Sequence, residues 1–153
     1  MNSLKLAVIG LGLIGKKHAT IIQNNQHMEL CGIVENNKLQ IKNAEIKSKV
    51  FNNIQELLDS DKPDGAIIAT PTPLHLAHAK IFIEKKIPIL IEKPISNSSS
   101  ETSDLLELAK KNSTKILVGH HRRHNNIIKS AKKAIEKGSI GKIRSVFSMC
   151  WFY

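Results

Sequence analysis

Short apolar runs rich in β-branched residues alternate along the chain with longer segments in which apolar residues recur every three or four positions. The short runs are typical of buried strands, and the longer segments of amphipathic helices. We therefore expect strands over Leu4–Ile9, Leu30–Val34, Val50–Phe51, Ala66–Ala69, Ile89–Ile91 and Ile116–Val118. Helices are expected over Ile14–Asn24, Lys38–Ser48, Ile54–Ser60, Leu74–Lys85, Ser99–Asn112 and Ile127–Lys137.

The order of these elements predicts the fold class. Six strand-helix alternations, with strands that are apolar almost throughout, indicate a parallel sheet covered on both faces. The start of one helix is well marked, because Ser98 and Glu101 have the spacing of a capping box. The sequence therefore predicts an α/β protein with a Rossmann-type, doubly wound parallel sheet in three α/β/α layers.

A glycine-rich stretch, Gly10-Leu11-Gly12-Leu13-Ile14-Gly15, follows the first expected strand and opens the first expected helix. In this position Gly10 allows a tight turn, Gly12 lets backbone N–H groups reach a pyrophosphate, and Gly15 lets helix and strand pack closely. The helix N-terminus also favours an anionic ligand. We assign Gly10, Gly12, Leu13, Ile14 and Gly15 to a dinucleotide site, with a ligand-free flexible turn as the alternative.

Glu35 ends the second apolar run, where a carboxylate can accept hydrogen bonds from both hydroxyls of an adenosine ribose. Such a carboxylate would repel a 2′-phosphate. Asn36 and Asn37 follow it where an enzyme that prefers NADP would be expected to carry an arginine, although Lys38 lies nearby. We therefore expect NAD rather than NADP as the cofactor, the alternative for Glu35 being a solvated carboxylate at a strand end.

The composition narrows the partners further. The chain of 153 residues has a formal net charge of +10, and residues 101–153 hold 11 basic against 4 acidic side chains. This excess suits a nucleotide, and one Trp, one Tyr and four Phe give no interleaved aromatic and basic pattern for nucleic-acid binding. The sequence also has no apolar run long enough to span a membrane. Two distant cysteines favour a reducing, cytoplasmic compartment.

Three more stretches follow the fourth, fifth and sixth expected strands, at the sheet edge where ligands bind in such folds. They read ATPTPLH, IEKP and VGHHRRH, and the chain later continues with KGSIGKIRSV. With the glycine loop, this order resembles the N-terminal half of the Gfo/Idh/MocA family of NAD(P)-dependent dehydrogenases over essentially the whole chain. The resemblance implies an oxidoreductase, usually homo-oligomeric, that moves a hydride between nicotinamide and a hydroxyl-bearing carbon of a sugar, cyclitol or related polyol.

The resemblance also implies roles for the IEKP stretch. Lys93 matches the lysine that reaches the substrate beside the nicotinamide, so it is the expected catalytic residue and part of the cofactor site. Desolvation under a bound cofactor favours a neutral amine, which can exchange a proton with a hydroxyl. Glu92 would orient Lys93 or contact the nicotinamide ribose, and Pro94 resembles the family's cis-proline. The alternative is a surface lysine in a turn.

The resemblance assigns two further groups to the cofactor site. The Thr70-Pro71-Thr72 turn offers backbone and hydroxyl groups for the phosphate-ribose bridge, with His75 in the helix that follows. His78 is expected to be a partly exposed helix residue. Arg122 matches one of a basic pair at the rim of the active cleft. His120 and His124 lie four residues apart without an acidic companion, so no metal site is expected, and His121 and His124 are given no role.

Family members continue into a second domain that carries most of the substrate pocket. We therefore expect residues 1–143 to form the NAD(P)-binding domain and residues 144–153 to be the first strand of a substrate domain that is missing from a truncated chain. Alone, the chain is expected to bind NAD and to lack turnover. The alternative is a nucleotide-binding module without turnover, either a relic or a component that needs a partner domain.

Overall fold

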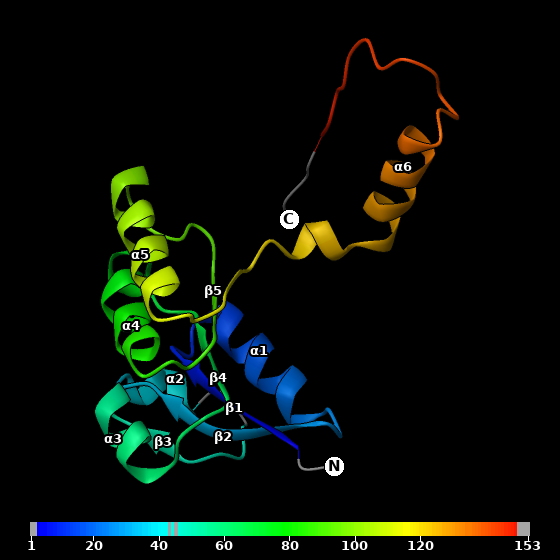
Figure 1. Ribbon diagram of the computed structural model, residues 1–153. Helices are drawn as coiled ribbons and strands as arrows, with labels where there is room; N and C mark the ends of the chain where they lie inside the picture. Colours follow the sequence, from blue (N-terminus) through cyan, green and yellow to red (C-terminus); the bar gives the residue numbers. More distant parts are fainter. Residues whose placement is uncertain (1–2, 43, 45, 150–153) are drawn as a thin grey trace. The chain divides into compact units, whose positions relative to one another are not determined.

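The computed structural model describes residues 3–42, 44 and 46–149, and the chain divides into two compact units, Met1–Gly119 and His120–Tyr153. The first unit is a six-stranded parallel sheet in the order β3-β2-β1-β4-β5-β6, with helices on both faces (Figure 1). This strand order is that of a Rossmann fold. The prediction of a doubly wound parallel sheet is confirmed.

The strands and helices of the first unit follow the predicted alternation. The strands are β1 (Leu4–Ile9), β2 (Met28–Val34), β3 (Val50–Phe51), β4 (Gly65–Ile68), β5 (Ile89–Ile91) and β6 (Ile116–Val118). The helices are α1 (Leu13–Gln23), α2 (Lys38–Lys42), α3 (Ile54–Ser60), α4 (Thr72–Glu84) and α5 (Ser99–Lys111). One of the two hydrogen bonds of the predicted capping box at the start of α5 is confirmed: the Ser98 side chain accepts from the Glu101 N–H at 3.3 Å.

The helix expected over Lys38–Ser48 is more than twice as long as the helix observed there. The helix α2 ends at Lys42, and residues 46–49 have no helical structure. The strand β2 binds this segment instead: the Lys49 carbonyl accepts from the Ile33 N–H at 2.9 Å, and the Ser48 hydroxyl donates to the Leu30 carbonyl at 3.0 Å. Backbone that pairs with a strand edge cannot also continue a helix, and sequence periodicity does not reveal this competition.

The core consists of two apolar layers separated by the sheet. Alternate residues of β1 enter different layers, since side chains of a strand point to opposite faces. Ile9 joins the layer with α3, α4 and α5, whereas Val8 joins the layer with α1, and both are fully buried. In Figure 1, α4 and α5 lie side by side on one face of the sheet and α1 on the other. This packing fixes the helices against the strands whose ends build the site.

The site position follows from the strand order. The chain runs from β1 to β2 and β3 on one side, then returns to β4 on the other side of β1. At such a switch point the loops after neighbouring strands diverge and leave a crevice at the carboxyl edge. The loops after β1, β2 and β4 therefore surround one space.

The second unit contains η1, a short 3-10 helix at His121–His124, and α6 (Asn126–Glu136). The Asn125 side chain caps α6 by accepting hydrogen bonds from the backbone of Ile127 and Ile128. Residues 144–149 are irregular, and residues 150–153 lie outside the described residues. The strand expected at 144–153 would need a strand to pair with, so that assignment and the boundary at 143 stay predictions. None of the helices among the described residues is both long and apolar enough to cross a membrane.

Phe82 provides a test of the packing of α4. Its side chain is fully buried, so Phe82→Ala should lower the free energy of unfolding by about 3–5 kcal/mol. Leu106→Ala on the neighbouring helix is the control, because that side chain is 51% exposed and its loss should change stability by at most about 0.5 kcal/mol. Urea denaturation of both variants measures this, and equal effects would contradict the assigned core.

Candidate functional site

The loop after β1 places Gly10 against the loop after β4. Gly10 has a φ of +94°, which L side chains rarely adopt. A Cβ at Gly10 would also lie 2.9 Å from the Ala69 carbonyl oxygen and 2.9 Å from the Thr70 methyl carbon. Only glycine therefore allows these two loops to touch.

The other two glycines of the loop differ sharply in their surroundings. A Cβ at Gly15 would collide with the carbonyl oxygen of Gly10, so the absence of a side chain lets α1 begin directly on the loop. A Cβ at Gly12 would meet no atom within 4 Å. Gly12 is the residue that precedes α1, and it offers the first turn no side-chain cap. The N-terminus of α1 is thus open to a ligand, and its unpaired N–H groups favour an anion.

Glu35 ties the end of β2 to the glycine loop. Its Oε2 accepts a hydrogen bond from the Leu11 N–H at 2.8 Å, and its Oε1 accepts from the N–H groups of Asn36 and Asn37 at 3.0 and 2.9 Å. A carboxylate can accept about four hydrogen bonds. Three are taken by the backbone, so Glu35 is held in one orientation with one position on Oε2 left for a ligand.

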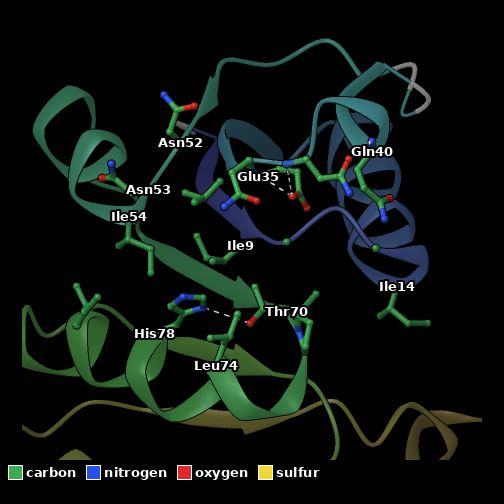
Figure 2. A pocket seen from close by; sticks show the side chains of 18 of the residues that line it. Ile9, Ile14, Glu35, Gln40, Asn52, Asn53, Ile54, Thr70, Leu74 and His78 are labelled. Carbon is green, nitrogen blue, oxygen red and sulfur yellow. Dashed lines mark hydrogen bonds between the residues drawn. The ribbon is translucent and has the colours of Figure 1, made fainter.

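The loops enclose a cavity of about 880 Å³ at the switch point (Figure 2). This volume is within the usual range for small-molecule sites. Of the residues assigned from the sequence to the cofactor site, the cavity is lined by Gly10, Gly12, Leu13, Ile14, Glu35, Thr70 and Pro71. Residues with amide side chains line it as well, from the loops after β2 and β3 and from the helices α2 and α3 that follow them, namely Asn36, Asn37, Asn52, Asn53, Gln40 and Gln55.

His78 also lines this cavity, which the sequence did not predict. Its Nδ1 lies 3.2 Å from the Thr70 hydroxyl oxygen, within hydrogen-bond distance (Figure 2). Burial lowers the pKa of His78 below its usual 6.5, and the neighbouring His75 lowers it further. The ring is therefore held neutral against the Thr70 turn. Its spacing of one helical turn from His75 was the signal available in the sequence.

The remaining residues assigned to the site lie outside the cavity wall. Thr72 begins α4, and His75 is only 1% exposed, with both ring nitrogens against backbone carbonyls. Glu92 and Lys93 follow β5, where the Lys93–Pro94 peptide bond is cis, as the family resemblance implies. The Glu92 carboxylate contacts His18 of α1, a residue that sequence reasoning missed. Gly15 is buried beneath the loop.

The histidine-rich stretch after β6 belongs to the second unit. His121–His124 forms the 3-10 helix η1, and Arg122 lies within it, so a contact between Arg122 and a cofactor stays a prediction. Among the residues that the structure describes, no three His, Cys, Asp or Glu side chains gather closely enough to hold a metal ion.

Comparisons with known proteins agree with this geometry. Residues 4–120 match the Gfo/Idh/MocA family model, described as an oxidoreductase family with an NAD-binding Rossmann fold. Glucose-6-phosphate 3-dehydrogenase of Bacillus subtilis is 31% identical over 147 residues, which cover 93% of this chain and 41% of that enzyme.

Two solved structures show the same fold. Myo-inositol 2-dehydrogenase from Lactobacillus plantarum superposes with a TM-score of 0.84 at 26% identity, over 93% of this chain and 43% of that one. The scyllo-inositol dehydrogenase from Lactobacillus casei, solved with NAD(H) and scyllo-inositol, gives 0.82 at 23% identity, over 92% of this chain and 43% of that one. The chain thus spans less than half the length of these relatives.

The lowered pKa of His78 predicts a pH dependence of stability. As pH falls through 6.5, the unfolded chain takes up a proton at His78 before the folded protein does. Acidification therefore favours the unfolded state until the pH reaches the pKa that His78 has in the folded protein. His78→Gln removes this proton uptake, so its free energy of unfolding should fall less than that of the parent chain between pH 7.5 and 5.0.

Urea unfolding at several pH values measures this difference. His27→Gln, at an exposed histidine, is the control for general effects of losing an imidazole. Parallel pH profiles for the parent chain and His78→Gln would contradict a neutral, buried His78.

Proposed function

The chain belongs to the Gfo/Idh/MocA oxidoreductase family with its NAD-binding Rossmann fold, and from this premise we propose that its first unit binds NAD(H) with the pyrophosphate over the glycine loop. The observation that carries the proposal is the open space at Gly12. A Cβ there would meet nothing within 4 Å, directly at the N-terminus of α1. Backbone N–H groups and the helix dipole then face a phosphate without an intervening side chain.

Glu35 would hold the adenosine ribose. The three backbone N–H groups that bind its carboxylate fix its direction, and the remaining position on Oε2 can accept a ribose hydroxyl. The same fixed negative charge opposes a 2′-phosphate. This supports NAD over NADP as the preferred cofactor.

Other residues that line the cavity would contact the parts of the dinucleotide beyond the pyrophosphate and the adenosine ribose. Thr70 and Pro71 supply a hydroxyl and backbone groups there, and Leu13 and Ile14 supply apolar surface beside the loop. The neutral His78 ring positions the Thr70 hydroxyl. Thr72 and His75 would contribute through the shape of the turn, since neither lines the cavity.

For the whole protein we propose a dehydrogenase that acts on a polyol or sugar. The bound nicotinamide would supply hydride transfer. Lys93 follows the carboxyl end of β5, which pairs with β4, and the loop after β4 lines the cavity. Its side chain would exchange a proton with the reacting hydroxyl. The relatives named for glucose 6-phosphate and myo-inositol support this substrate class.

A binding module without turnover is the second candidate. It is favoured by the position of Lys93 outside the cavity wall. A steady-state assay with NAD⁺ and a panel of inositols, hexoses and hexose phosphates separates the two. Binding of NADH without reduction of NAD⁺ by any polyol would support the module.

Two glycine variants test the position of the pyrophosphate. Gly12→Ala adds a methyl group to open space, so its free energy of unfolding should change by at most about 0.5 kcal/mol while NADH affinity falls about tenfold or more. Gly15→Ala should reduce both stability and affinity, because its methyl group meets the Gly10 carbonyl.

Isothermal titration with NADH and urea unfolding measure the two quantities. A Gly12→Ala chain that binds NADH as tightly as the parent would place the pyrophosphate elsewhere.

The cofactor preference has its own test. We expect NADH to bind at least about tenfold more tightly than NADPH at matched ionic strength, a difference of about 1.4 kcal/mol. Glu35→Gln removes the negative charge and should narrow this ratio. Lys38→Ala is the matched control at an exposed residue on α2, and should leave the ratio wide. Tighter binding of NADPH than of NADH by the parent chain would overturn the assignment.

A further inference from the structure

Two histidines from different helices meet the loop that carries Lys93. His18 belongs to α1, the helix that begins at the glycine loop, and His75 belongs to α4, the helix that follows the Thr70 turn. Neither lines the cavity, and the proposed function gives neither a direct contact with substrate or cofactor. Both form hydrogen bonds to residues that flank Lys93.

His18 holds the residue before Lys93. Its Nε2 lies 2.9 Å from Oε1 of Glu92, and both side chains are largely buried, with exposed fractions of 23% and 15%. Because a carboxylate only accepts hydrogen bonds, Nε2 carries the proton. The other oxygen of Glu92 accepts from the Lys93 N–H at 3.3 Å. His18 thus acts on the Lys93 backbone through the carboxylate.

Gly119 confines the same carboxylate from the other side. A Cβ at Gly119 would lie 2.7–2.8 Å from the carboxylate atoms of Glu92, so Glu92 occupies the space that a side chain would need. The Gly119 N–H donates to the Ile91 carbonyl at 2.8 Å, which keeps the end of β6 beside the end of β5. Glu92 therefore has little freedom to leave His18.

His75 holds the residue after Lys93. Its Nδ1 lies 2.9 Å from the Pro94 carbonyl oxygen and its Nε2 lies 2.7 Å from the Thr70 carbonyl oxygen. A neutral ring donates to one of these carbonyls, and a doubly protonated ring donates to both. In either state the buried ring spans the Thr70 turn, which lines the cavity, and the Lys93–Pro94 loop.

We propose that His18 and His75 are positioning residues that hold Lys93 from both sides and fix it relative to the dinucleotide cavity. That this arrangement serves proton transfer rests on the proposed function of Lys93. The arrangement links Lys93 to both elements that would contact the cofactor: His18 to the helix of the glycine loop, and His75 to the Thr70 turn. Binding of a dinucleotide in the cavity should therefore change the environment of the Lys93 backbone.

The first test follows the Lys93 amide by hydrogen exchange in the 153-residue chain. His18→Ala frees the Glu92 carboxylate, so the Lys93 amide should exchange about tenfold faster. His18→Gln retains an N–H donor and should restore the rate to within about threefold of the parent. Gly119→Ala displaces Glu92 from the other side and should accelerate exchange as His18→Ala does. His27→Ala, at an exposed histidine, should leave the rate unchanged.

These measurements are made without dinucleotide, so they remain decisive even where NADH does not bind. A folded His18→Ala chain whose Lys93 amide exchanges at the parental rate would overturn the role of His18. A chain that shows the predicted exchange pattern and fails to bind NADH would instead overturn the proposed function.

The second test concerns His75 and coupling to the cavity. In the parent chain, a ring N–H of His75 should be visible by NMR and slow to exchange with water; a rapidly exchanging ring would contradict its bonds to the two carbonyls. Addition of NADH should shift the Lys93 amide resonance. In His75→Gln, and in His75→Phe where it folds, this shift should fall to half or less. An undiminished shift in folded His75→Gln would overturn the coupling.

Discussion

The contact between Gly15 and the carbonyl oxygen of Gly10 is the constraint on which the site depends. It brings the first turn of α1 onto the end of β1, with no side chain between them. The N-terminus of the helix then opens toward the switch point of the sheet, where the loops after β1, β2 and β4 surround one cavity. A larger residue at this one position would move the helix away from the strand and with it the N–H groups that face the ligand.

Hydrogen-bonded carboxylates extend this constraint to neighbouring strands. Glu35 binds the Leu11 N–H and so joins the end of β2 to the glycine loop. Glu92 binds His18 and so joins the end of β5 to α1. Both acidic side chains are satisfied mainly by the protein itself, which gives them fixed orientations before any ligand arrives. A site built in this way loses little entropy of its own when it binds a dinucleotide.

The sequence predicted the strands and most helices closely, because local apolar periodicity and the burial of the strands agree throughout the first unit. It also placed Gly10, Gly12, Glu35, Thr70 and Pro71 at one edge of the sheet, because their positions follow from strand order, and these five line the cavity. Gly15 and Thr72, assigned to the same site, do not line it. It could not predict the early end of α2, because this depends on the hydrogen bonds that Ser48 and Lys49 form with β2. The role of His18 depends on its contact with Glu92, 74 residues further along the chain, and no spacing in the sequence encodes this contact.

An NMR titration of the isotopically labelled chain with NAD⁺ locates the ligand residue by residue and so tests whether the dinucleotide lies over the glycine loop. The amide resonances of the glycine loop, of Asn36 and Asn37, and of Thr70 should shift together with one dissociation constant. Shifts confined to residues 120–149, or no shift in the glycine loop at saturating NAD⁺, would contradict this position of the dinucleotide.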